Sequence, residues 1–158
     1  MRMARKERSR MTAGTILMQT AMAVLVTLAF ATIYRVKFKH LPTVAAGGGI
    51  SWLLYCLSFL FFSSSFFSNF CAALFSSAYA EAAARIRRAP TVVFLLPCLI
   101  PLVPGSGLYY TLSYAILRNS VQFNHYLSIT IEATFGIAAG VVMIPVIMNC
   151  LARPDCEK

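Results

Sequence analysis

The sequence is poor in charge, and above all in acidic side chains. Only 12% of its 158 residues are charged, and just five are Asp or Glu. Hydrophobic residues make up 59% of the chain, and its mean hydropathy is +0.72. A soluble globular domain carries about 25% charged residues. The composition therefore excludes a soluble domain and predicts an integral membrane protein with a single domain.

Motifs for several kinds of chemistry are also missing. The five cysteines form no CxxC pair and have no histidine at ligand spacing, so neither a metal site nor a disulfide framework is predicted. No phosphate-binding loop, dinucleotide fingerprint or HExxH helix occurs, and no cofactor is expected. The net charge of +9 comes from short clusters beside apolar runs, unlike a nucleic-acid-binding face. We therefore expect neither an enzyme nor a nucleic-acid partner.

Apolar segments predict an all-α integral membrane protein with four to five transmembrane helices. They form a single transmembrane domain over 11–151, between a basic tail at 1–10 and a second tail at 152–158. The first segment is longer than the roughly 7–15-residue core of a signal peptide. The start site, Met1 or Met11, stays open, and counting charges weakly favours an outside N-terminus. The predicted spans are 12–34, 43–62, 66–88, 91–117 and 126–151.

The fourth segment contains an unusual density of helix breakers. Pro101 and Pro104 lack a backbone N–H donor, and Gly105 and Gly107 permit backbone angles that are closed to other residues. Because an unpaired backbone group in hydrocarbon costs several kcal/mol, such a break must be packed in protein or line a polar cavity. We expect the segment at 91–117 to be one span broken near mid-membrane, or else a re-entrant hairpin.

The break offers a binding site for a small anion. A second half-helix would begin near Gly105, so its free N–H groups and the positive end of its dipole would face a carboxylate. Carbonyl groups freed on the other half would accept hydrogen bonds from an ammonium group. The alternative is a packed kink without a ligand. The predicted substrate-binding residues are Pro101, Pro104, Gly105, Ser106, Gly107, Tyr109 and Tyr110.

Two acidic residues lie within predicted spans, where charged groups are costly. Glu81 has Arg85 one helical turn further on, so it is either an ion-paired structural residue or a functional one. Glu132 has no cation near it in the sequence, which favours proton coupling or pairing with a substrate ammonium. The alternative for Glu132 is a protonated carboxyl bonded to a neighbouring helix. These three residues are the candidate charge partners.

Small residues predict two helix-packing surfaces. One is the pair Gly136-x-x-x-Gly140 in the last span, and the other is a face of the third span. The latter contains Ala72, Ser76, Ala80 and Ala84. A non-transporting scaffold that associates through these surfaces is the alternative function.

Two runs carry a family resemblance: AEAAARIRRAP at residues 80–90 and IPLVPGSGLYYT at residues 100–111. Together they resemble the threonine/serine exporter (ThrE) family, and in particular its small, YjjB-like subunit, over roughly residues 11–150. The resemblance implies export of threonine, serine or a related carboxylate such as succinate across the bacterial cytoplasmic (inner) membrane. It also implies a larger YjjP-like companion subunit. We expect a secondary exporter that is coupled to the proton gradient.

Overall fold

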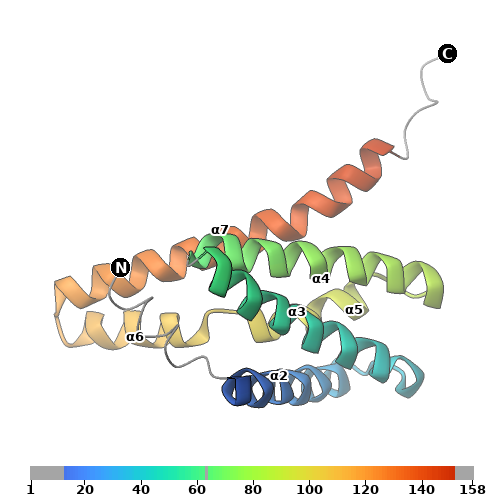
Figure 1. Cartoon of the computed structure of the whole chain (residues 1–158), viewed down its shortest axis with the longest axis horizontal. Helices are drawn as coiled ribbons and strands as arrows, with labels where there is room; N and C mark the ends of the chain where they lie inside the picture. The colour runs from blue at the N-terminus through green and yellow to red at the C-terminus, as the bar shows by residue number, and fades with distance from the viewer. Residues whose placement is uncertain (1–12, 63, 152–158) are drawn as a thin grey trace.

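The computed structural model describes residues 13–62 and 64–151, and within these ranges the chain forms helices and no strand. The predicted all-α class is confirmed, while both predicted tails lie outside the described residues. In chain order the elements are α2 (Ala13–Ile33), η1 (Phe38–His40), α3 (Leu41–Phe62), α4 (Ser65–Arg87), α5 (Val92–Leu99), η2 (Ile100–Leu102), α6 (Gly105–Ile116) and α7 (Ser120–Leu151) (Figure 1).

Three stretches are long and apolar enough to cross a membrane. They are Gly14–Ile33 in α2, Phe38–Phe62 over η1 and α3, and Ser120–Cys150 in α7. A fourth candidate is the pair Val92–Leu102 and Gly105–Ile116, which is bent by 52° at the intervening break. The described chain thus offers three or four candidate spans, where the sequence predicted four to five.

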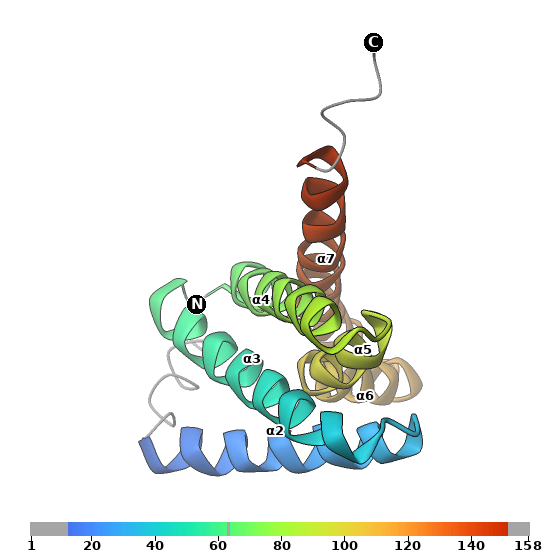
Figure 2. The ribbon, with the colours of Figure 1, turned by 90° about the vertical axis from the view of Figure 1, so that its right-hand side faces the viewer.

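The helix that accounts for this difference is α4. It is 23 residues long, but it carries several serines, Asn69 and the charged residues Glu81, Arg85 and Arg87. Figure 2 shows α4 in the middle of the bundle, with α2 on one side and α7 on the other. Its main contacts are with α3, α5 and α7. Because other helices cover it, α4 can be built from small and polar residues that lipid would not favour.

The packing of α4 against α7 depends on the Gly136-x-x-x-Gly140 pair. A Cβ atom at Gly136 would lie 2.5 Å from the carbonyl oxygen of Phe66, and one at Gly140 would lie 2.7 Å from that of Phe70. Only glycine lets two backbones approach so closely.

The predicted face of α4 packs elsewhere: the Ser76 hydroxyl donates to the Ser51 Oγ of α3 at 2.7 Å, and Ala80 and Ala84 pack with Phe94 of α5. Both predicted small-residue surfaces are therefore occupied inside the chain, although not by each other.

The last helix begins earlier than expected, at Ser120 and not at Tyr126. Asn119 starts it: the Gln122 N–H donates to the Asn119 Oδ1 at 3.3 Å, and the Phe123 N–H donates to the Asn119 carbonyl at 3.0 Å. An asparagine side chain that accepts a first-turn N–H is a favoured helix cap. Residues 120–125, which lay outside the predicted spans, therefore form the first part of α7. The C-terminal end of α7 extends away from the other helices (Figure 1).

Candidate functional site

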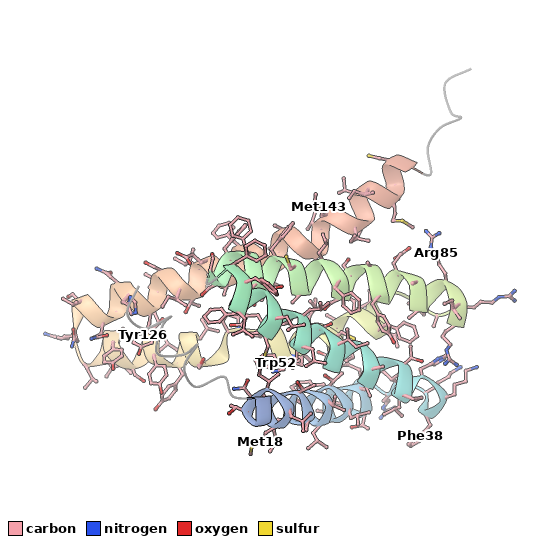
Figure 3. The ribbon with its side chains drawn as sticks, in the orientation of Figure 1. Met18, Phe38, Trp52, Arg85, Tyr126 and Met143 are labelled. Atoms are coloured by element: carbon pink, nitrogen blue, oxygen red, sulfur yellow. The ribbon has the colours of Figure 1, made fainter. Side chains whose placement is uncertain are left out.

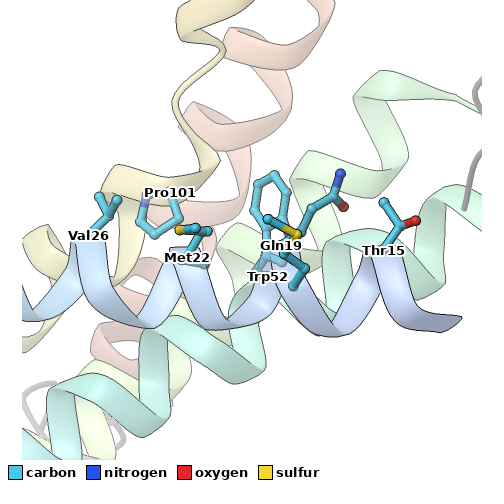
Figure 4. A pocket seen from close by; sticks show the side chains of 8 residues that line it. Thr15, Gln19, Met22, Val26, Trp52 and Pro101 are labelled. Carbon is cyan, nitrogen blue, oxygen red and sulfur yellow. The ribbon is translucent and has the colours of Figure 1, made fainter. Parts of the chain in front are cut away.

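The break between η2 and α6 lies beside the middle of α2. Pro101 lines a cavity together with Met22 and Val26, which are central residues of α2 (Figure 4). A bend of 52° redirects the chain at the break without reversing it. Accordingly, α5 and α6 follow one another along the long axis of the molecule (Figure 1). This geometry favours one broken span over a re-entrant hairpin.

The first turn of α6 leaves backbone donors open. The Gly105 N–H donates to the Val103 carbonyl at 2.7 Å, which closes a tight turn around Pro104. No side chain caps the helix, and within the described structure the N–H groups of Ser106 and Gly107 have no acceptor. The N–H groups on which the predicted anion site depends are therefore unpaired.

The two glycines of this turn differ in their surroundings. The expectation that they adopt angles closed to other residues is wrong, because no glycine in the described structure has a positive φ. A Cβ at Gly105 would meet nothing within 4 Å, whereas one at Gly107 would lie 2.5 Å from the Thr130 Oγ1 of α7. Gly107 thus permits close packing, whereas the position of a Gly105 side chain is open.

The α6 helix presents most of its predicted site residues to the outside. It packs mainly against α7 and stands clear of α2, α3 and α4 (Figures 1 and 2). Gly105 and Ser106 are exposed, as are Tyr109 at 66% and Tyr110 at 43%. Tyr110 stacks on Tyr126 of α7 with ring centroids 5.0 Å apart. The first turn of α6 is therefore open to whatever covers this side of the chain.

Glu81 lies at the basic end of the bundle, one helical turn from Arg85. Figure 3 shows Arg85 at one end of the molecule and Tyr126 at the other. The Arg85 Nη2 is 3.5 Å from the Glu81 Oε1, and the Thr91 hydroxyl donates to the Glu81 Oε2 at 3.0 Å. Glu81 thereby links the end of α4 to the residue that precedes α5. This arrangement supports the structural alternative for Glu81.

Glu132 is exposed on α7 and does not face the break. Thr130 lies against Gly107 of α6, and successive residues of an α-helix are about 100° apart around its axis. Two residues further on, Glu132 therefore points about 160° away from the contact with α6. The structure does not bring Glu81, Glu132 and the first turn of α6 together. Within the described residues no group of His, Cys, Asp or Glu could hold a metal ion.

A cavity of about 470 Å³ lies between α2, α3 and η2. Figure 4 shows Gln19, Met22 and Val26 on the side of α2 that faces Pro101, with Trp52 of α3 beside them. Two polar atoms of this lining are buried without a hydrogen-bond partner, namely the Gln19 Oε1 and the Trp52 Nε1. The cavity thus has mainly apolar walls, and the two unpaired polar atoms are buried within those walls.

A family model described as threonine/serine exporter, ThrE, matches residues 19–147. The chain belongs to this exporter family. Searches of the curated proteins and of the solved structures gave no match. The family and the candidate spans together make the chain a multi-pass membrane protein of the transporter class. All the predicted site residues lie within the matched range.

Sequence reasoning about this exporter did not single out Gln19 or Trp52. A signal for each was present, because Trp52 is the only tryptophan of the chain and Gln19 is the only amide side chain in α2. Their spacing along the sequence does not show that both line one cavity. That relation depends on how α2 packs against α3.

Proposed function

We propose that this chain is the small subunit of a two-component secondary transporter. It exports threonine and serine, or related small carboxylates such as succinate, across the bacterial cytoplasmic membrane. The observation that carries the proposal is the first turn of α6, where the Ser106 and Gly107 N–H groups are unpaired beside the open space at Gly105. Unpaired N–H groups at a helix N-terminus bind carboxylates, the group that all of these substrates share.

The exposure of this turn supports the requirement for a companion subunit. An unpaired backbone donor is unfavourable in hydrocarbon, and so is an ionisable side chain such as that of Glu132. A larger YjjP-like subunit that packs against α6 and α7 would shield both from lipid. The carboxylate site would then lie between the two proteins, and movement of one against the other would give alternating access.

Glu132 is the residue to which we assign proton coupling. It is exposed on a helix long and apolar enough to span the membrane, and the structure gives it no cationic partner within the described residues. A carboxyl group at a subunit interface changes its protonation when the interface opens and closes. Glu81, in contrast, joins α4 to the start of α5 through Thr91, and Arg85 pairs with Glu81 within α4.

The test is an export assay in bacteria that lack their own threonine exporters. Cells would express this chain alone, the large subunit alone, or both, and intracellular threonine and succinate would be measured after loading. We expect export only when both subunits are present. Equal retention of both compounds in all strains would reject the transport proposal, and full export by this chain alone would reject the two-component arrangement.

A further inference from the structure

We propose that the basic end of the molecule binds the headgroup phosphate of an anionic phospholipid. The cations of this site come from two connections, one between α2 and α3 and the other between α4 and α5. The inference concerns the lipid around the chain and goes beyond the export function. It requires only that the chain is a multi-pass membrane protein.

Cations are concentrated at this end of the molecule. The described residues contain seven Lys or Arg and only two carboxylates. Glu81 pairs with Arg85 alone, and no carboxylate in the described part of the chain pairs with any other cation. Clusters of about 4–8 Lys or Arg beside a membrane helix are typical of binding to anionic lipid. Six of the seven cations lie in two short segments, and all six are exposed: Arg35, Lys37, Lys39, Arg85, Arg87 and Arg88.

The two basic segments, 35–39 and 85–88, lie side by side although about fifty residues separate them in the sequence. The Arg87 Nη2 donates to the Thr43 hydroxyl of α3 at 3.1 Å, which joins the end of α4 to the start of α3. Val36 of the first segment is buried in one cluster with Ala84, the residue directly before the second segment. The six cations therefore form one surface.

The way in which α2 and α4 end turns two arginines outward. Arg35 and Arg88 are left-handed, with φ of 53° and 49°. In each case the N–H of the next residue donates to a carbonyl five residues before it, at 3.0 Å for Val36 and 3.1 Å for Ala89. This turn returns Val36 and Ala89 to the core and leaves both arginines exposed. The guanidinium groups are thus free to contact a phosphate.

Apolar side chains between the cations favour a lipid over a soluble anion. Phe38 is 87% exposed between two lysines, and Ile86 is 80% exposed between two arginines. Phe38 also begins Phe38–Phe62, which is long and apolar enough to cross a membrane, and Figure 3 shows it at the same end as Arg85. A phospholipid can place its phosphate among the cations while its acyl chains cover the apolar side chains. Free phosphate would leave those side chains in water.

The experiment measures lipid binding to the full chain in a neutral detergent by native mass spectrometry. The chain would be titrated with dioleoyl phosphatidylglycerol, dioleoyl phosphatidylcholine and inorganic phosphate. The two lipids have the same acyl chains and each has a phosphate, but only phosphatidylglycerol has a net negative charge. We expect saturable binding of phosphatidylglycerol, at least about tenfold tighter than that of phosphatidylcholine, and no binding of inorganic phosphate at the same concentrations.

Three arginines allow a matched comparison. Arg35, Arg88 and Arg118 all have positive φ, and Arg118 belongs to the turn between α6 and α7 at the opposite end of the molecule (Figure 1). Glycine adopts this conformation without strain, so each arginine-to-glycine change removes a charge and preserves the turn. Arg35→Gly and Arg88→Gly should each weaken phosphatidylglycerol binding about fivefold, and the double variant at least about tenfold. Arg118→Gly should bind within about twofold of the unchanged chain.

Phe38→Ser tests the contact with the acyl chains. It removes an exposed apolar side chain without changing the charge, so phosphatidylglycerol binding should weaken at least about threefold. Thermal unfolding in lipid-free detergent, followed by circular dichroism, should be the same for this variant and the unchanged chain. If a variant does not accumulate in the membrane, the comparison of the two lipids on the unchanged chain decides alone.

Four outcomes would overturn the inference and leave the export function standing. Equal affinities for the two lipids would show that the charge of the headgroup is not recognised. Equal losses in all three arginine variants would remove the basic end as a defined site. Inorganic phosphate that binds as tightly as the lipid would indicate a site for a soluble anion. Displacement of the lipid by the large subunit would assign the surface to a protein interface.

Discussion

Gly107 of α6 lies so close to Thr130 of α7 that a Cβ atom on the glycine would stand 2.5 Å from the threonine Oγ1. The Thr130 hydroxyl donates to the Tyr126 carbonyl at 2.8 Å, which keeps it in this position. The contact joins the first turn of α6 to the middle of α7. It therefore determines where the unpaired N–H groups of Ser106 and Gly107 are presented.

Replacing Gly107 by alanine should destabilise the α6–α7 contact. The added Cβ overpacks against Thr130 at a cost of about 1–3 kcal/mol, which exceeds the gain of up to about 1 kcal/mol from better helix propensity. Gly105→Ala is the matched control, because its Cβ meets nothing within 4 Å. Denaturant unfolding in detergent, followed by circular dichroism, measures both. Equal stabilities would contradict the contact, and Thr130→Ala should partly restore Gly107→Ala.

A larger side chain at Gly105 should stop transport without unfolding the protein. Gly105→Val puts a branched side chain into the open space beside the first turn of α6, where it would hinder a carboxylate, so we expect export to fall more than tenfold while the amount in the membrane is unchanged. Tyr114→Phe serves as the control, since the ring that stacks on Tyr126 at 5.4 Å is retained. Normal export by Gly105→Val would remove the first turn of α6 from the substrate site.

Alanine at Gly136 or Gly140 should destabilise the bundle more than alanine at Gly107. The new Cβ atoms would lie 2.5 Å and 2.7 Å from backbone oxygens of α4, and a backbone cannot rotate aside as a threonine side chain can. We expect losses of about 2–3 kcal/mol or more in the same unfolding assay. Gly14→Ala, with nothing within 4 Å of its Cβ, is the control. A neutral Gly140→Ala would contradict the observed α4–α7 packing.

Neutralising the two glutamates should have different effects. Glu132→Gln should make the rate of export independent of pH while assembly in the membrane stays normal. Glu81→Gln should leave the pH profile unchanged. It should also change the stability little, because a partly exposed ion pair such as that with Arg85 contributes only about 0–1 kcal/mol. The measurement is threonine export at several external pH values. An unchanged profile in Glu132→Gln would exclude it from proton coupling.

Labelling of single cysteines should separate a broken span from a re-entrant hairpin. The Arg87 Nη2 donates to the Thr43 hydroxyl at 3.1 Å, so the ends of α4 and α3 that carry the basic loops lie together. Lys37→Cys and Arg118→Cys would be introduced into a chain without other cysteines and treated with an impermeant maleimide. If residues 91–117 form one broken span, the two positions react from opposite sides, with Lys37 on the cytoplasmic side. Reaction from the same side would indicate the hairpin.

Several features of the chain could be predicted from local sequence. Apolar length identified the membrane class, and the prolines at 101 and 104 located the break, because a missing N–H donor acts within one helical turn. Gly136 and Gly140 were predicted to be a packing surface, and they pack against the backbone of α4 at Phe66 and Phe70. The resemblance to the exporter family was confirmed over residues 19–147.

Other features depended on which distant segments meet. The sequence by itself determined that the chain is helical, is apolar enough for a membrane and breaks near Pro104, because hydropathy and backbone chemistry are properties of neighbouring residues. Only the tertiary structure decided that Gly107 packs while Gly105 leaves space, and that Glu132 points away from the break. It likewise decided that Gln19 and Trp52 share a cavity. Each of these relations depends on the angle and position at which two helices cross, and side chains far apart in the chain set that geometry jointly.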